Sequence, residues 1–306
     1  MIAKITLGTR GSELARAQTL LVEKAIRSVH PSAAIETKII ATRGDNARIV
    51  ELNAGRKGLF TAEIERALLA KEVDVAVHSA KDLPSQASPG ARIAGVLPRA
   101  PINDVLISKH CGGLASVPCG AIVATGSVRR QRQLRWKRAD LEVVDLRGNV
   151  PTRLRKLAEN KWDGIVLARA GLERLGFSPT RTESSFEGML LFLEILPCEI
   201  FVPAGGQGII ALQIRSDDQS TKALLEPVND RDTLLCLQAE REFLSRLHGD
   251  CNFPVGVHAT ITNGKMKLRA QVFEGESPPP RQAEVEGASD EGDQLAAELL
   301  RKIEQH

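Results

Sequence analysis

The chain has 306 residues, of which 42% are hydrophobic, and its formal net charge is +3. This length is enough for two or three domains with substantial cores, and so small a net charge gives no reason by itself to expect nucleic-acid binding. Only 3% of the residues are aromatic and tyrosine is absent, which argues against a base-stacking surface for single-stranded nucleic acid.

The first residues and the five cysteines indicate the cellular compartment. The opening MIAKITLGTRGS lacks the basic and apolar regions of a secretory signal, and no later segment reaches the roughly 18 consecutive apolar residues of a membrane-spanning helix. The cysteines are odd in number and include no C-x-x-C pair. We therefore expect a soluble cytoplasmic protein with free thiols.

Strand and helix patterns alternate from the start of the chain. Residues 2–8 alternate like a strand, and residues 12–28 follow with helical periodicity and Ser12 as a plausible N-cap. The predicted apolar face of this helix consists of Leu14, Ala17, Leu21, Val22 and Ala25. The same order recurs through AAIETKIIATRGD, GLFTAEIERALLAKE and VDVAVHSAKDLP. This alternation is typical of an α/β fold with a largely parallel sheet.

The prolines of LPRAPIND, residues 97–104, interrupt this pattern, and a second α/β unit follows from DVLISK to LFLEILPCEIF. The end of the chain differs from both. A helical pattern at RDTLLCLQAEREFLSRL is followed by alternating residues on both sides of Asn263-Gly264, which is a strong hairpin signal. DQLAAELLRKI then predicts a closing helix, so we expect a small α+β third domain.

The segment ATGSVRRQRQLR places hydroxyl groups and arginines at the start of a predicted helix. A helix N-terminus can bind an anion, and arginine holds a carboxylate or phosphate through two hydrogen bonds. The candidate residues here are Thr125, Ser127, Arg129 and Arg130. A solvated basic face with a serine cap is the alternative. Further arginines in similar loops, namely Arg10, Arg147 and Arg153, favour a ligand with several negative charges at the carboxyl ends of the strands.

The segment VAVHSAKDLP, residues 75–84, ends a buried-strand pattern with His78, Ser79, Lys81 and Asp82. An aspartate before Leu-Pro is typical of a turn or a cap. It could equally be an acid or an ion-pairing group that nearby cations keep ionised. The spacing leaves both interpretations open.

Residues 205–211, GGQGIIA, match the G-x-G-x-x-A pattern of dinucleotide sites, with Glu226 at a suitable distance. The β-branched continuation IIALQIR predicts a strand, however, where such a site needs a helix. We therefore do not expect dinucleotide binding here.

Cys251 lies among the turn-forming residues of RLHGDCNFPVG. A free thiol in a partly exposed loop is the reactive kind, although an incidental loop cysteine in a reducing cell explains the position equally well. Potential metal ligands are His248 with Cys251, or His110 with Cys111 and Cys119. Neither set has paired ligand spacing, so we predict no metal site.

The chain contains, in this order, GTRGSELARAQ, TRGD, GRKGLFTAEIERALL, HSAKDLP, ATGSVRRQRQL, LRGNVPTRLRKL, IVLARAGLERLG, PAGGQGIIALQIR and GDCNFPVG. From about residue 4 to residue 274 it thereby resembles the hydroxymethylbilane synthases, also known as porphobilinogen deaminases. The resemblance implies two similar α/β domains of the periplasmic-binding-protein-like kind flanking a cleft, with a small α+β C-terminal domain. The implied boundaries are 1–97 with 200–216, then 104–194, then 224–306, with hinges at 97–104 and 194–200.

In this family a loop cysteine carries a dipyrromethane cofactor through a thioether bond, and that cysteine falls on Cys251. The family's catalytic aspartate falls on Asp82, where a carboxylate can assist proton transfer to a leaving amine and stabilise the resulting cation. The implied reaction is the deaminating head-to-tail condensation of porphobilinogen on this primer, followed by hydrolytic release of hydroxymethylbilane, in porphyrin and heme biosynthesis. The residues implied to bind the carboxylates of cofactor and substrate are Arg10, Ser12, Lys57, Ser79, Lys81, Thr125, Ser127, Arg129, Arg130, Arg147 and Arg153.

Three departures from the family pattern affect cofactor contacts. The cofactor loop reads HGDC instead of EGGC, Gly126 stands between Thr125 and Ser127 where a serine is usual, and Asn53 replaces a common lysine. These changes leave individual contacts open, but not the anchoring cysteine or the catalytic aspartate.

Two other classes of function share part of the pattern. A non-catalytic anion-binding protein of the solute-binding type would also have two α/β domains and arginine loops, but it has no need for Cys251 and normally carries a signal peptide. A nucleic-acid binder could use RRQRQLRWKR, yet this charge is local and stacking residues are scarce. We expect porphobilinogen as the partner, no nucleic acid, no membrane, and a monomer.

Overall fold

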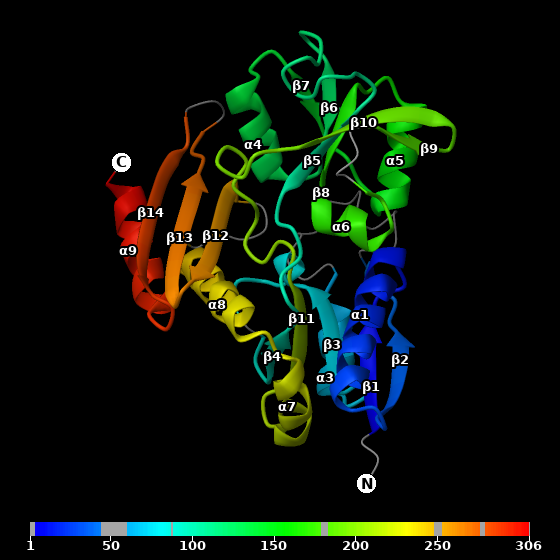
Figure 1. The fold of residues 1–306 in the computed structure, drawn as a ribbon, viewed down its shortest axis with the longest axis vertical. Helices are drawn as coiled ribbons and strands as arrows, with labels where there is room; N and C mark the ends of the chain where they lie inside the picture. Colours follow the sequence, from blue (N-terminus) through cyan, green and yellow to red (C-terminus); the bar gives the residue numbers. More distant parts are fainter. Residues whose placement is uncertain are drawn as a thin grey trace.

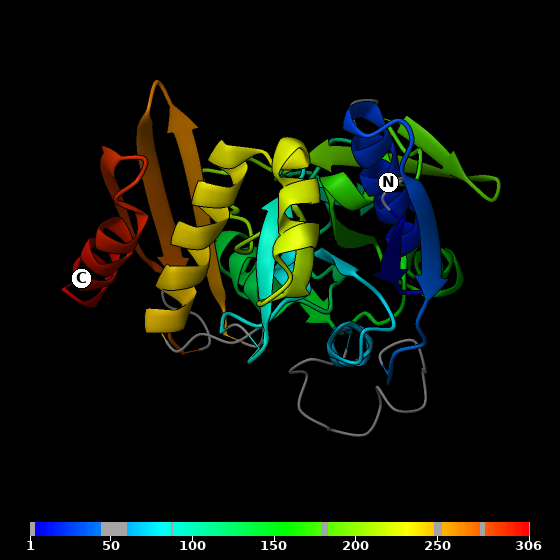
Figure 2. The ribbon, with the colours of Figure 1, turned by 90° about the horizontal axis from the view of Figure 1, so that it is seen from below.

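The computed structural model describes residues 4–43, 60–86, 88–178, 183–247, 253–275 and 279–305. Within these ranges the chain forms three β-sheets (Figure 1). The first two are covered by helices in α/β units, and the third lies at one end of the molecule, opposite the end formed by α1 and β2 (Figure 2). No helix in the described ranges is long and apolar enough to cross a membrane.

The first sheet has the strand order β2-β1-β3-β11-β4. Its strands are β1 (Lys4–Thr9), β2 (Ala34–Ile39), β3 (Val75–Ser79), β4 (Ala91–Val96) and β11 (Ile210–Arg215). The associated helices are α1 (Glu13–Val29), α3 (Ala62–Leu69) and α7 (Gln219–Leu225). The side chains of β3 alternate between two cores, because Val75 and Val77 pack in the cluster that contains α1 while Ala76 packs in the cluster that contains α3.

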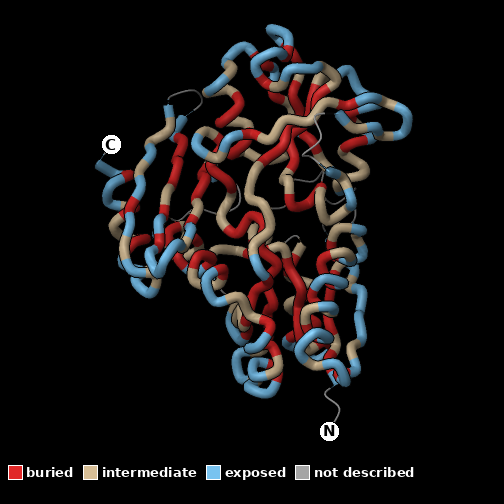
Figure 3. Tube along the Cα trace, in the orientation of Figure 1, coloured by how far each residue is buried: buried red, intermediate tan, exposed pale blue. Residues whose placement is uncertain are grey.

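The second sheet has the order β7-β6-β8-β5-β10-β9. Its strands are β5 (Asp104–Ser108), β6 (Ile122–Ala124), β7 (Glu142–Val144), β8 (Gly164–Ala168), β9 (Glu183–Phe186) and β10 (Met189–Ile195). Its helices are α4 (Val128–Lys137), α5 (Val150–Glu159) and α6 (Arg169–Arg174). Figure 3 shows that buried residues follow the strands of this sheet and of the first.

Both sheets are mixed, so the prediction of a largely parallel sheet is wrong. In the first, β1 is parallel to β2 and β3, but β11 lies antiparallel between β3 and β4. In the second, β6 is parallel to β7 and β8, whereas β5, β10 and β9 add antiparallel pairs. The expected α/β class is confirmed; the direction of pairing was missed because β11 comes from far along the chain, and periodicity does not identify a strand's neighbours.

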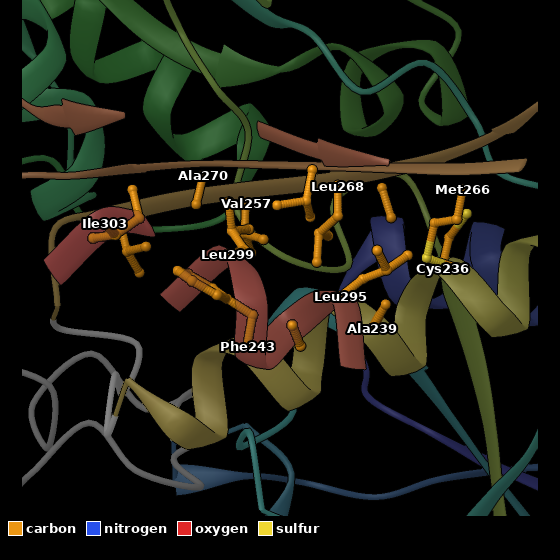
Figure 4. Packing of buried hydrophobic residues seen from close by; sticks show 14 of the residues in the cluster. Cys236, Ala239, Phe243, Val257, Met266, Leu268, Ala270, Leu295, Leu299 and Ile303 are labelled. Carbon is orange, nitrogen blue, oxygen red and sulfur yellow. The ribbon is translucent and has the colours of Figure 1, made fainter. Parts of the chain in front are cut away.

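The third unit is α+β, as expected. It consists of β12 (Val255–Thr262), β13 (Lys265–Val272) and β14 (Arg281–Ala288), packed against α8 (Arg231–Arg246) and α9 (Gly292–Glu304). Figure 4 shows Phe243 of α8 and Leu299 of α9 packed beneath the sheet. The hairpin prediction is confirmed, because Asn263 and Gly264 have φ values of 51° and 75° and these left-handed conformations suit a tight turn between antiparallel strands.

Helix α1 begins as predicted but turns a different face inward. The Ser12 hydroxyl accepts a hydrogen bond from the Ala15 N–H at 3.3 Å, which confirms the N-cap. The buried stripe is Ala15, Gln18, Thr19, Val22 and Ile26, and the predicted core residue Leu21 is 40% exposed. Of the predicted face, Val22 is confirmed as buried and Leu21 is wrong. The buried stripe is shifted because it includes the polar residues Gln18 and Thr19, which a search for apolar periodicity does not count.

Segment 205–211 is confirmed as the approach to a strand. Residues 210–215 form β11, so a dinucleotide would find no helix N-terminus after these glycines.

Candidate active site

Strand β3 delivers Lys81 and Asp82 to the carboxyl end of the first sheet. The buried strand ends at Ser79, and residues Ala80–Asp82 form one turn of 3₁₀ helix that the Leu83 N–H closes onto the Ala80 carbonyl at 3.2 Å. This turn lies between the two α/β units (Figure 1). Asp82 is thus a turn residue, as its local sequence predicts, and the turn also brings its carboxylate close enough to Arg153 of the second unit to raise the pKa of that arginine.

The pKa of Lys81 is shifted by burial and by charged residues of both α/β units. Burial, and after it the charge of Arg130, lowers the pKa of Lys81 to about 8, while Asp82 and Asp104 act in the opposite direction. Because Lys81 follows β3 of the first unit and Arg130 lies in α4 of the second, the charges of the two α/β units interact at this point.

His78 is the buried neighbour of this turn. Burial lowers the pKa of His78 to about 4, against the raising effects of Glu65, of the hydrogen bond with Gln213 at 3.1 Å, and of Asp82. The imidazole is therefore neutral at neutral pH, and it supports the end of β3 as a hydrogen-bonding core residue.

Arg129 and Arg130, at the start of α4, converge on one carboxylate. Asp104 Oδ2 accepts from Arg129 Nη1 at 2.9 Å and Asp104 Oδ1 accepts from Arg130 Nη2 at 2.7 Å. Burial alone would raise the pKa of Asp104, but the two guanidinium groups hold it well below its usual range. Arg129 and Arg130 are only 4% and 5% exposed, so the alternative of a solvated basic face is wrong for both.

This cluster keeps an excess positive charge and spare donors. Two guanidinium groups share a single carboxylate, and the Nε atoms of Arg129 and Arg130 are buried with no hydrogen-bond partner in the described part of the chain. An unpaired buried donor is costly. The arrangement therefore fits an additional anionic ligand.

The loop before α4 brings its backbone close to the second sheet. Thr125 is fully buried, and its hydroxyl oxygen accepts from the Ser127 N–H at 3.4 Å. A Cβ on Gly126 would overlap the carbonyl oxygen of Leu146. The family usually has serine at this position. In this chain the backbone at Gly126 lies so close to the backbone at Leu146 that there is no room for a side chain.

Arg147 and Arg153 border the start of α5. Arg147 Nε donates to Asp145 Oδ2 at 2.6 Å, and Arg153 Nε donates to the Gly148 carbonyl at 2.7 Å. Burial, and next Arg130, lowers the pKa of Arg153 to about 10, while Asp82 raises it. Asp82 and Arg153 therefore interact although they belong to different α/β units.

Arg10, Ser12 and Ser79 lie at the carboxyl ends of β1 and β3. The Arg10 guanidinium lies 4.2 Å from the centre of the Phe60 ring, and its positive charge contributes to the low pKa of His78. Ser12 is occupied as the cap of α1. The Ser79 hydroxyl is held by Gln18, whose Nε2 lies 2.7 Å away.

Sequence reasoning missed two polar residues at this site. Asp104 organises Arg129 and Arg130, and Gln18 orients Ser79. Gln18 could have been found from the sequence, because helical spacing places it on the same face as Ala15 and Val22, and a polar residue on such a face needs a partner. The signal for Asp104 was weaker, because an aspartate that opens a strand directly after a proline-rich segment is typical of an ordinary loop end.

Two predicted residues, Lys57 and Cys251, lie outside the described residues, as do Asn53 and the HGD segment before the cysteine. The structure therefore gives no geometry for the proposed anchor. Within the described ranges, no three His, Cys, Asp or Glu side chains are grouped so that they could hold a metal ion.

A cavity of about 510 Å³ opens on the second sheet, away from the predicted residues. It is lined by β5, by β10 and by the loop around Cys111. None of the predicted site residues lines it, so the candidate site rests on the charged side chains around Asp82.

Comparison with known proteins agrees with these features. Residues 5–223 match the family described as "Porphobilinogen deaminase, dipyromethane cofactor binding domain", and residues 234–305 match "Porphobilinogen deaminase, C-terminal domain". The chain is 42% identical over 300 residues to the porphobilinogen deaminase of Roseiflexus sp. (strain RS-1), covering 97% of this chain and 95% of that protein. It is 41% identical over 300 residues to that of Syntrophomonas wolfei, covering 98% and 94%.

Among solved structures, the methionine binding protein MetQ is similar with a TM-score of 0.44 and 13% identity, covering 76% of this chain and 92% of that one. The sequence matches are far stronger and run over nearly the whole chain. This protein therefore belongs to the porphobilinogen deaminase family, whose members are transferases of tetrapyrrole biosynthesis with a dipyrromethane cofactor.

Proposed function

We propose that Asp82 is the catalytic group of a hydroxymethylbilane synthase and that Cys251 is the covalent attachment point of its dipyrromethane cofactor. The observation that carries the proposal is the approach of the turn at 80–82 to Arg130 of α4 and Arg153 of α5, since Arg130 lowers the pKa of Lys81 and Asp82 raises the pKa of Arg153. A carboxylate surrounded by cations from two units suits a reaction in which a positively charged group departs and carboxylated rings must be held.

The donor set fits a ligand with several carboxylates. When bound, dipyrromethane would supply the free pyrrole carbon to which the first substrate unit is joined, and each later unit would be joined to the terminal ring of the growing chain. Arginine can clamp a planar carboxylate through paired N–H groups, and the buried Nε atoms of Arg129 and Arg130 offer donors for one. The proposed binding residues are Arg10, Ser12, Lys57, Ser79, Lys81, Thr125, Ser127, Arg129, Arg130, Arg147 and Arg153.

Asp82 would act on the aminomethyl group of porphobilinogen. Its carboxylate oxygen can accept a hydrogen bond from the substrate's ammonium group and hold it in place. When the carbon–nitrogen bond breaks, the electron pair leaves with ammonia and the pyrrole keeps a positive charge. The same carboxylate then stabilises that cation until the next carbon–carbon bond forms.

We extend the proposal to organisation and surroundings. The domains are 1–97 with 200–216, then 104–194, then 224–306, which is supported by the position of β11 inside the first sheet. Segments 97–104 and 194–200 act as hinges. The protein works as a cytoplasmic monomer on porphobilinogen, with no nucleic-acid or membrane partner.

The arginines should serve different stages of the reaction. Arg129→Leu leaves Asp104 buried with one partner fewer, so we expect impaired folding and impaired cofactor assembly. Arg153→Leu should allow assembly but weaken one elongation stage by about 10- to 150-fold, the scale of one charge-assisted hydrogen bond. Mass spectrometry after limited addition of porphobilinogen would count the pyrrole units carried by each variant.

Arg155→Leu provides a matched control for that experiment. Arg155 lies on the same helix, its side chain is 50% exposed, and it pairs with Glu187 at 3.5 Å; exposed pairs of this kind contribute little. Its distribution of pyrrole units should equal that of the unsubstituted protein. Identical distributions for Arg129→Leu, Arg153→Leu and their counterparts at Arg10 and Arg130 would mean that these side chains supply only a general positive field.

Lys81 should make substrate capture depend on pH. With a pKa of about 8, the ammonium loses its proton as the pH rises through that value, and its attraction for carboxylates is lost with it. We expect kcat/KM, which reports the free enzyme, to fall by up to about tenfold per pH unit above pH 8. The variant Lys81→Arg keeps its charge at these pH values and should hold kcat/KM to higher pH. Superimposable pH profiles for the two proteins would exclude Lys81 as the titrating group.

A further inference from the structure

We propose that Gly206 is a positioning residue for Asp82, and that Glu240 fixes Gly206 in place. The inference rests on the proposed role of Asp82 in the reaction. It concerns the segment PAGGQG, residues 203–208, whose glycines have no assigned role once dinucleotide binding is rejected.

Gly206 lies directly against the turn that carries Asp82. It has φ +74°, and a Cβ at this position would lie 3.0 Å from both the carbonyl carbon of Ala80 and the backbone nitrogen of Lys81. These are backbone atoms of the turn, so they cannot rotate away as the end of a flexible side chain could. Any side chain at position 206 must therefore push the turn itself.

In the described part of the chain, one of the backbone hydrogen bonds that hold the turn comes from the segment around Gly206. The internal closure of the turn is the bond from Leu83 N–H to the Ala80 carbonyl at 3.2 Å, and the Ala80 N–H donates to the Ile209 carbonyl at 3.0 Å. The external hydrogen bond comes from the segment around Gly206, and Ala80 and Leu83 also pack in a buried cluster with Val96 of β4 and Leu237 of α8. The position of Asp82, two residues after Ala80, thus depends on where that segment lies.

Glu240 of α8 holds the segment from the third unit. Its carboxylate is fully buried, and Oε2 accepts from the Gly206 N–H at 2.7 Å. Oε1 accepts from the Ala259 N–H at 2.8 Å, and Arg99 binds both oxygens at 2.6 and 3.2 Å. Because the partners of the carboxylate lie on several parts of the fold, Glu240 holds the Gly206 amide in a defined position relative to α8 and β12.

The next two residues of the segment are held in the same way. Arg99 Nε donates to the Gln207 carbonyl at 2.9 Å, and Arg174 Nη2 donates to the Gly208 carbonyl at 2.7 Å. The 206–208 backbone is therefore a rigid backing. Its two arginine supports come from the segment between the α/β units and from α6 of the second unit, and its carboxylate support from the third.

The chain offers a matched pair of glycines to test this. Gly264 has φ +75°, nearly the same as Gly206, but no described atom lies within 4 Å of the position that its Cβ would take. An alanine at either site meets the same backbone strain, whereas only Gly206→Ala also displaces the turn. We expect both variants to lose thermal stability, and Gly206→Ala to lose more because its turn must also shift by a few tenths of an ångström. Only Gly206→Ala should lower kcat, by about 10-fold, since a misplacement of about 1 Å can cost roughly 100-fold.

A positioning role predicts more than lower activity. Gly206→Ala should carry the same covalent adduct by intact mass and should lower kcat by a larger factor than it raises KM, because Lys81 is the one proposed binding residue on the displaced turn. Glu240→Gln gives a second route, which loosens Gly206 without adding a side chain. Its control is Glu242→Gln on the same helix, a partly exposed residue paired with Arg246 at 2.7 Å, which should leave kcat unchanged.

Three outcomes separate the inference from the proposed function. Low kcat in Asp82→Asn, Gly206→Ala and Glu240→Gln, with normal kcat in both controls, supports it. Low kcat in Asp82→Asn with normal kcat in folded Gly206→Ala or folded Glu240→Gln overturns it while leaving the role of Asp82 intact. Normal kcat in Asp82→Asn overturns the role of Asp82 and the positioning role together.

Discussion

Asp82→Asn should lower turnover by roughly 10²-fold or more while leaving the protein folded and its cofactor attached. The substitution removes one negative charge at nearly constant shape, and a single acid–base or electrostatic group commonly contributes a factor of this size. Steady-state ammonia release from porphobilinogen would measure it. Asp82→Glu should keep partial activity, because the carboxylate remains but its distance from the turn changes.

A distant aspartate provides the control for charge removal. Asp293 is exposed in the first turn of α9, so Asp293→Asn should change only a weak interaction with the helix dipole and leave turnover unaltered. Near-normal turnover of Asp82→Asn would return Asp82 to the role of an ordinary turn residue.

Cys251→Ser should abolish activity altogether in a chain that still folds. A serine hydroxyl has nearly the same size as the thiol, but it is a far weaker nucleophile at neutral pH, so no thioether can form. Circular dichroism and thermal unfolding would show whether the fold is retained, and product formation would show the loss.

Cys111→Ser is the matched control, because Cys111 is also an exposed free thiol of the described chain. This variant should keep both turnover and adduct. Substantial activity in Cys251→Ser, or loss of activity in Cys111→Ser, would move the anchor to another residue.

Local chemistry in the sequence was sufficient for several elements. Ser12 caps α1, Asn263-Gly264 forms the hairpin turn, and residues 210–215 form a strand rather than the helix of a dinucleotide site. Each of these features depends on residues close together in the chain. Propensity and turn chemistry therefore predict them.

Long-range partners could not be predicted in this way. The sequence does not state that β11 lies antiparallel beside β3, nor that Gln18 occupies a buried place on α1 to hold Ser79. The predicted arginine cluster is similar. Arg129 was recognised as an anion-binding candidate, but its pairing with Asp104, 25 residues earlier, appears only in the fold.

For the site, the sequence indicates which residues take part, and the structure shows how some of them are arranged. Family resemblance supplied Asp82, Cys251 and the carboxylate-binding residues, and their roles remain predictions. The structure adds that the turn after β3 approaches Arg130 of α4 and Arg153 of α5, because Arg130 lowers the pKa of Lys81 and Asp82 raises the pKa of Arg153. It also adds a rigid backing for that turn at Gly206.

The intact mass of the purified protein tests the central claim most directly. The account predicts the polypeptide mass plus two linked pyrrole units, and the unmodified polypeptide mass for Cys251→Ser. A fully active preparation at the unmodified mass, or an adduct that persists in Cys251→Ser, would contradict it.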